Sequence, residues 1–182
     1  MRDLTTALIV SKMENEMVDY IGNRCVEHDI ITEEDLQFVC YSYLLGLFIK
    51  PHWNDRWRAF NKLHDKKVSK YPDLTLFRER SRRVVVELKQ EVGRSVTKED
   101  IGADITKISN ILSSDEELKF GVVLATIFDE HGVIQEWLLS EYREQLENER
   151  LRLILIDISA KIEDITNWKR EQEQMELAFR GK

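Results

Sequence analysis

Three ionisable side chains in residues 72–90 have the types and spacing that hydrolytic chemistry requires. Asp73 precedes a short apolar run, and Glu87 and Lys89 lie two residues apart in a second apolar run. On a β-strand, residues two apart point to the same face, so Glu87 and Lys89 share a face that Asp73 can also reach. Two converging carboxylates repel each other unless a cation lies between them, and oxygen ligands of this kind suit Mg²⁺. A lysine beside such a cation can stabilise a developing anion or help to activate water.

A β-hairpin is the element that must position these groups. The polar sequence RERSRR separates two sets of apolar residues that favour strands, and this pattern predicts a strand, a turn and a strand over 73–90: Leu74, Leu76, Val84, Val85, Val86 and Leu88. The alternative for the charges is a plain salt bridge between Glu87 and Lys89 on an exposed strand face. The three valines favour a buried strand instead, where charged side chains are costly unless they have a counter-charge or a function.

Pro72-Asp73 followed by Glu87-Leu88-Lys89, with fourteen residues from Asp73 to Glu87, resembles the signature of the PD-(D/E)XK nucleases, the restriction-endonuclease-like superfamily. The resemblance covers roughly residues 30–130. It implies an α/β fold with a restriction-endonuclease-like mixed central β-sheet flanked by helices, to which this chain adds N- and C-terminal helices. It also implies a metal-dependent endonuclease that hydrolyses DNA phosphodiester bonds with Mg²⁺, for which Mn²⁺ can substitute.

The resemblance further implies a role for each site residue. Asp73, Glu87, the Leu88 carbonyl and Glu33 would hold the metal, and Lys89 would position the nucleophile or neutralise charge in the transition state. Members of this superfamily usually carry a glutamate on the helix before the hairpin. We choose Glu33 because it lies on the inward side of the helix predicted over 32–48, and Glu34 is the alternative. Both glutamates could instead simply complement the N-terminus of that helix.

The helix predicted behind the hairpin offers a further basic group. Thr97 is its predicted N-cap, and the helix runs over 98–114 with Asp104 and Lys107 within one turn of each other. Family members commonly present a polar or basic side chain from this helix, so Lys107 either fills that role or faces solvent. Gln90, at the end of the hairpin, either orients a water or a phosphate or only begins the next loop.

The remaining elements alternate between helical and strand patterns. Their expected ranges are helices over 3–28 with Asp3 as a candidate N-cap, 32–48 with Thr32 and Asp35 forming a near capping box, and 133–150, strands over 119–128 and 151–158, and a helical tail over 160–182. This order is that of an α/β sandwich with a mixed sheet. We expect one domain over 1–182, with its core at about 30–160 and helical extensions over 1–29 and 161–182. The terminal helices either cover their own sheet or join two copies in a homodimer.

Residues 49–71 show no regular pattern. Aromatic and basic side chains interleave there, as they would on a nucleic-acid surface or in a short helix with an aromatic inner face: Trp53, Trp57, Phe60, Arg56, Arg58 and Lys62. The net charge of the chain is −7, but residues 50–94 carry +7 and the rest carries −14. Basic charge therefore surrounds the suspected site, where phosphate contacts would be needed, although a solvated basic loop is the alternative. That the partner is DNA is implied by the resemblance to the nuclease superfamily.

The composition indicates a cytoplasmic protein. No apolar run is long enough to span a membrane, and the first thirty residues lack a signal-peptide pattern. Cys25 and Cys40 fall in helical patterns and indicate buried thiols, with a disulfide as the alternative. None of the four histidines has metal-ligand spacing. The alternative to a nuclease is a non-catalytic nucleic-acid-binding or assembly subunit on the same fold.

Overall fold

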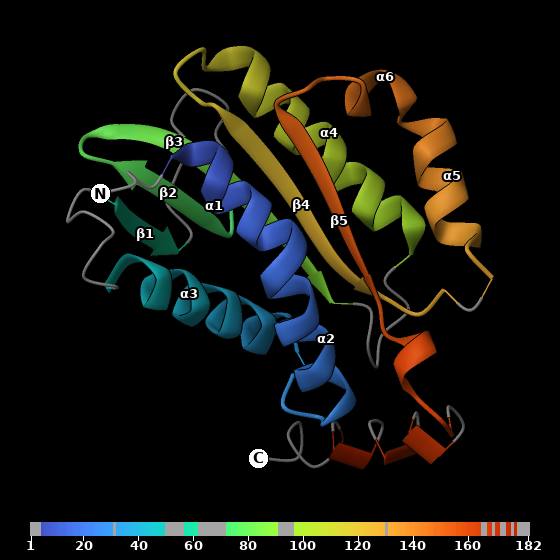
Figure 1. Ribbon diagram of the computed structural model, residues 1–182. Coiled ribbons are helices and arrows are strands. Elements are labelled where there is room, and N and C mark those ends of the chain that lie inside the picture. The colour runs from blue at the N-terminus through green and yellow to red at the C-terminus, as the bar shows by residue number, and fades with distance from the viewer. Residues whose placement is uncertain are drawn as a thin grey trace.

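A five-stranded mixed β-sheet forms the centre of the protein (Figure 1). The computed structural model describes residues 5–30, 32–49, 57–61, 72–90, 97–129 and 131–164, together with 167, 168, 170, 171, 174, 175 and 177. The strands lie side by side in chain order: β1 (Trp57–Asn61), β2 (Leu74–Arg78), β3 (Ser81–Gln90), β4 (Phe120–Ile127) and β5 (Leu151–Asp157). β1, β2 and β3 pair antiparallel, whereas β3, β4 and β5 pair parallel. The hairpin predicted over 73–90 is therefore confirmed as β2 and β3.

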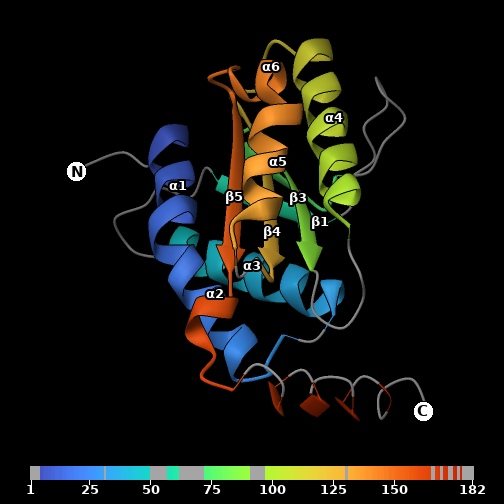
Figure 2. The same cartoon turned by 90° about the vertical axis from the view of Figure 1, so that its right-hand side faces the viewer.

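Helices cover both faces of this sheet (Figure 2). One face carries α1 (Thr6–Lys12), the π-helical turn η1 (Met13–Met17), α2 (Val18–Val26) and α3 (Glu33–Ile49). The other face carries α4 (Lys98–Ser114), α5 (Val133–Glu141) and α6 (Arg143–Leu146), and the short helix η2 (Ser159–Lys161) follows β5. The expected α/β architecture with a mixed sheet between helices is thus confirmed.

The side chains of β3 alternate between these two layers. Val84, Val86 and Leu88 belong to the apolar cluster under α1, α2 and α3, whereas Val85 belongs to the cluster under α4. The period of two places Glu87 and Lys89 on the α4 side with Val85. β4, predicted as a strand over 119–128, is buried from Gly121 to its end.

Two glycines allow α4 to pack closely against its neighbours. A Cβ atom on Gly121 of β4 would overlap the Cγ2 atom of Ile108, and one on Gly102 would overlap the Tyr142 ring. Native interiors have no room for such overlaps. Gly121 therefore determines how close α4 lies to the sheet, and with it where Asp104 and Lys107 lie, whereas Gly102 allows Tyr142 to pack against α4.

The helix caps predicted at Thr32 and Thr97 are confirmed. The Thr32 backbone N–H and hydroxyl donate to the Asp35 carboxylate, and the Asp35 backbone N–H donates to the Thr32 hydroxyl. Thr97 and Asp100 form the same reciprocal box at the start of α4. Such boxes satisfy N–H groups that the first helical turn leaves unpaired, and here they fix the starts of the two helices that face the hairpin.

Three expectations about elements need correction. The N-terminal helix begins at Thr6 with Thr5 as its N-cap, and the candidate cap Asp3 lies outside the described residues. Residues 57–61 form β1 rather than part of a short helix, with Trp57 buried and Phe60 exposed. The helix predicted over 133–150 is two helices that meet at Tyr142, and Val133 at its start is 58% exposed.

The structure decides between the alternatives for the two cysteines, which were thiols or a disulfide, and for the tail, which covers its own chain or joins a second copy. Cys25 and Cys40 are free, buried thiols, and burial raises the pKa of Cys25 to about 12. Trp168 packs against His28 and Phe128, and its indole N–H donates to the Val26 carbonyl, so this part of the tail covers its own chain. Among the helices described, none combines the length and the apolar character that a membrane span requires.

Candidate functional site

Asp73 is fixed where β2 meets β3. One Oδ atom of its carboxylate accepts a hydrogen bond of 2.9 Å from the Leu88 backbone N–H, and the Asp73 carbonyl accepts one of 2.9 Å from the Gln37 side chain of α3. The register pairs Leu74 with Val86, so one further step places Asp73 opposite Glu87. The strand pairing thus brings together two carboxylates that are fourteen residues apart in the sequence.

Glu87 is the most deeply buried acid of the site, with 3% of its surface exposed. Its Oε1 atom lies 2.6 Å from the ammonium nitrogen of Lys107, which reaches down from α4. Lys107 therefore belongs to the site, and the alternative of a solvent-facing lysine is wrong. The exposed Glu87–Lys89 salt bridge considered from the sequence is also wrong, because Glu87 is buried and pairs with Lys107.

Lys89 lies between two other carboxylates. Its ammonium nitrogen is 3.2 Å from Glu33 at the start of α3 and 3.5 Å from Asp104 on α4. Glu33 and Gln37 are four residues apart and therefore lie on one face of α3. The structure thus brings Glu33 to the site, whereas the adjacent Glu34 is exposed.

Burial and crowding shift the pKa values of these groups. Burial and the nearby Asp73 carboxylate raise the pKa of Glu87 to about 8, although Lys107 opposes the shift. Burial also raises the pKa of Asp104, against the opposing effect of Lys89 and Lys107. Burial acts to lower the pKa of Lys89, but Asp104 and Glu33 outweigh it and the pKa is raised. Glu87 and Asp104 therefore hold their protons more tightly than usual, chiefly because burial disfavours their charged forms.

A count of the ionisable groups shows that carboxylates outnumber ammonium groups in the site. We call the following six residues the charge cluster: Glu33, Asp73, Glu87, Asp104, Lys89 and Lys107. Four carboxylates face two ammonium groups, which leaves two negative charges when all six are ionised. Buried charges that lack a counter-charge are costly, so a divalent cation would complement the charge cluster.

The donor set fits a hard divalent cation in chemistry and charge. Mg²⁺ takes oxygen ligands and commonly uses one or two carboxylates from the protein. Asp73 and Glu87 provide these, and Asp73 anchors the peptide of Leu88, whose carbonyl is a third oxygen. In the ranges described above, no three His, Cys, Asp or Glu side chains are grouped so as to hold a metal ion. Glu33 and Glu87 instead have ammonium groups as neighbours.

Asp104 and Gln37 are the members of this site whose contacts the sequence did not reveal. Asp104 follows Ile101 and precedes Ile105 on the buried side of α4, so an acid in an apolar stripe was the available signal. Gln90 is the last residue of β3 and is buried. Its side chain donates to the Ile30 carbonyl and contacts the Thr126 hydroxyl, which ties the segment before α3 to β3 and β4.

Three of the six basic and aromatic side chains named as a possible nucleic-acid surface lie outside the described residues. They are Trp53, Arg56 and Lys62, whereas Trp57, Arg58 and Phe60 are part of β1. Arg58 and Phe60 are exposed on that strand, and Phe60 makes an edge-on ring contact with Phe77 of β2. Of the two aromatic residues in β1, Trp57 is buried, so only Phe60 presents an exposed ring.

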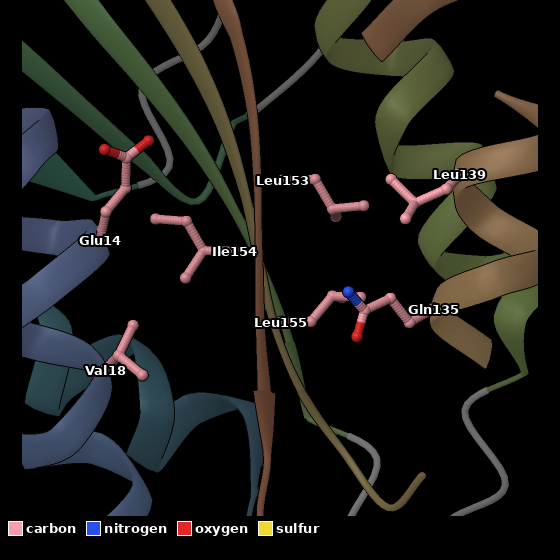
Figure 3. Close-up of a pocket in the computed structure, with 7 residues that line it drawn as sticks. All are labelled: Glu14, Val18, Gln135, Leu139, Leu153, Ile154 and Leu155. Carbon is pink, nitrogen blue, oxygen red and sulfur yellow. The ribbon is translucent and has the colours of Figure 1, made fainter. Parts of the chain in front are cut away.

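A pocket that contains no member of the charge cluster lies along β5 (Figure 3). It measures about 320 Å³, and most of the side chains that line it are apolar: Val18, Leu139, Leu153, Ile154 and Leu155, with Glu14 and Gln135. Its carboxylate, Glu14, lies 3.3 Å from Arg152. This groove lacks a cluster of reactive groups, so the charge cluster is the stronger candidate for chemistry.

No protein-family model matches the chain, and neither the curated proteins nor the solved structures contain a match to it.

Proposed function

We propose that the protein is a metal-dependent nuclease that hydrolyses DNA phosphodiester bonds on a restriction-endonuclease-like fold. The observation that carries the proposal is the convergence of Asp73, Glu87 and Lys89 at the β2–β3 hairpin, inside a cluster with an excess of negative charge. The antiparallel hairpin joined to parallel strands supports the proposed fold, and the sequence signature supports DNA as the substrate.

Asp73, Glu87 and the Leu88 carbonyl would hold the cation, with Glu33 as the fourth ligand. When bound, Mg²⁺ would lower the pKa of a coordinated water and stabilise negative charge on phosphate oxygens. The protein contributes a fixed arrangement, because the Leu88 N–H and the Gln37 side chain hold Asp73 in place before any substrate arrives. Such preorganised charge avoids reorganisation at the moment of reaction.

Lys89 would place a positive charge beside the phosphate. Glu33 and Asp104 hold its ammonium group from two sides and raise its pKa, so it stays protonated at neutral pH. A lysine that is always charged stabilises the negative charge of the transition state rather than removing a proton from water. We therefore assign Lys89 to charge stabilisation.

The test is an incubation of the purified protein with plasmid and with single-stranded DNA, in Mg²⁺, in Mn²⁺ and in EDTA. We expect cleavage with either metal, none in EDTA, and severe loss in Asp73→Ala and Lys89→Ala. Absence of metal-dependent cleavage on every substrate, or cleavage that survives both substitutions, contradicts the proposal.

The second candidate function is a non-catalytic binding or assembly subunit. The observation that favours it is that both lysines of the charge cluster already lie beside carboxylates, as they would in a purely structural network. In that case the cluster contributes only to folding. Retention of DNA on a filter without cleavage, together with loss of thermal stability in Asp73→Ala and no response to Mg²⁺, would support this candidate over the nuclease.

A further inference from the structure

Lys107 interacts with two acids of the charge cluster, Glu87 and Asp104. Its ammonium nitrogen lies 2.6 Å from Glu87 Oε1. Its charge also acts on Asp104, where it opposes the increase in pKa that burial causes. The side chain of Lys107 is 19% exposed, whereas Glu87 is nearly inaccessible. Lys107 thus lies on the side of Glu87 that is nearer to solvent.

Glu87 needs a counter-charge whenever it is ionised, whether or not it holds a cation. A buried carboxylate beside a second carboxylate is costly, and breaking a buried ion pair leaves that cost uncompensated. A lysine on the neighbouring helix meets the need, because its flexible four-carbon stem can move the ammonium group without moving the backbone. Lys89 is less suited, since it is held between Glu33 and Asp104.

We propose that Lys107 is an exchangeable counter-ion of Glu87, and that a divalent cation displaces its ammonium group when the cation binds. The inference rests on the proposed function, because it assigns Glu87 to a cation. Two cations that share one carboxylate repel each other, so Lys107 and the divalent ion compete for Glu87. The exchange gives the ionised form of Glu87 a counter-charge before the cation binds, and it moves the ammonium group away from Glu87 afterwards.

The wild-type protein provides the first test. We would acylate its amines with an N-hydroxysuccinimide ester, with and without saturating Mg²⁺, and quantify each lysine by mass spectrometry. Lys119, which is exposed at the start of β4, is the internal reference. We expect Mg²⁺ to raise the modification of Lys107 several-fold relative to Lys119. Unchanged or reduced modification of Lys107 overturns the inference.

The second test measures Mn²⁺ binding by calorimetry in the wild type, Lys107→Met and the control Lys119→Met. Because a competitor is removed, we expect Lys107→Met to bind Mn²⁺ about fivefold or more tightly, whereas the control stays at the wild-type value. Equal or weaker binding by Lys107→Met overturns the inference, because it shows that Lys107 does not compete with the cation for Glu87. If Lys107→Met does not fold, the acylation of the wild type decides.

These outcomes separate the inference from the proposed function. Cleavage that depends on Asp73, combined with unchanged acylation of Lys107, leaves the nuclease standing and rejects the exchange. Failure of both the wild type and Lys107→Met to bind Mn²⁺, together with no cleavage, rejects both.

Discussion

The ammonium group of Lys107 lies 2.6 Å from a carboxylate oxygen of Glu87, and this contact joins α4 to β3. Lys89 makes a similar link from β3 to both α3 and α4 through Glu33 and Asp104. The charge cluster therefore lies where three elements from distant parts of the chain meet. A substitution at one member is expected to affect the others, because their charges act on each other across short distances.

Glu87 should make the stability of the protein depend on pH. Its folded pKa of about 8 exceeds its ordinary value of 4.5, so between these values the folded protein holds a proton that the unfolded chain has lost. Its contribution to stability is thus greatest below pH 4.5 and is lost as the pH rises toward 8. Glu87→Gln should gain on the wild type by on the order of 2–4 kcal/mol across this window.

Urea denaturation at several pH values between 5 and 8.5, without added metal, measures this difference. Glu34→Gln is the matched control, because Glu34 is an exposed glutamate beside the site. If the unfolding free energies of the wild type and Glu87→Gln keep a constant difference throughout, the raised pKa of Glu87 is wrong.

Gly121 should be essential to the placement of α4. Gly121→Ala adds a Cβ atom that overlaps Ile108, so α4 must move away from the sheet. We expect a loss of about 1–3 kcal/mol in the free energy of unfolding, which is typical of overpacked cores. Gly46→Ala is the control, since nothing lies near its added Cβ atom, and it should gain about 0.5–1 kcal/mol from helix propensity. Equal effects of the two substitutions would rule out a tight α4–β4 contact.

Asp104 should position Lys89. Asp104→Asn removes one of the two carboxylates beside the ammonium group while keeping the size of the side chain. We expect the rate of DNA cleavage to fall about 10-fold or more, the usual scale for a supporting partner of a site. Its pH profile should also change, because Asp104 raises the pKa of Lys89. The exposed Glu99→Gln on the same helix is the control, and a wild-type rate and profile in Asp104→Asn would exclude the positioning role.

Glu33 and Glu34 form a matched pair of neighbours. Glu33 lies 3.2 Å from Lys89, whereas Glu34 is exposed, so only Glu33→Gln should slow cleavage. The expected loss is about 10-fold, because the side chain of Glu33 is 41% exposed and water can replace part of its contribution. Steady-state rates on plasmid DNA compare the two variants, and equal rates would show that both glutamates only complement the helix N-terminus.

The parts of the fold with strong local signals could be predicted from the sequence. The run over 119–128 predicted β4 because a strand buried on both faces is continuously apolar. Thr32 and Thr97 allowed the starts of two helices to be predicted, because helix capping is a local interaction. The strand β1 was missed because Phe60 faces outward, and an apolar residue on the exposed face conceals the period of two.

The charge cluster was predictable only where local pattern determined it. Asp73, Glu87 and Lys89 follow from hairpin register and alternation within one segment. Asp104 was missed because its proximity to Lys89 depends on how α4 crosses the sheet between β3 and β4, and this depends on contacts such as that of Gly121 with Ile108. The break at Tyr142 was missed for a similar reason, since no glycine or proline marks it and the Tyr142 ring packs over Gly102.

Direct binding of Mn²⁺, followed by the electron paramagnetic resonance signal of the free ion, tests the central claim that Asp73 and Glu87 hold a divalent cation. We predict that the wild type and Glu34→Gln bind Mn²⁺, and that Asp73→Asn and Glu87→Gln bind it at least about 10-fold more weakly. No bound Mn²⁺ in the wild type, or equal binding in Asp73→Asn, would contradict it.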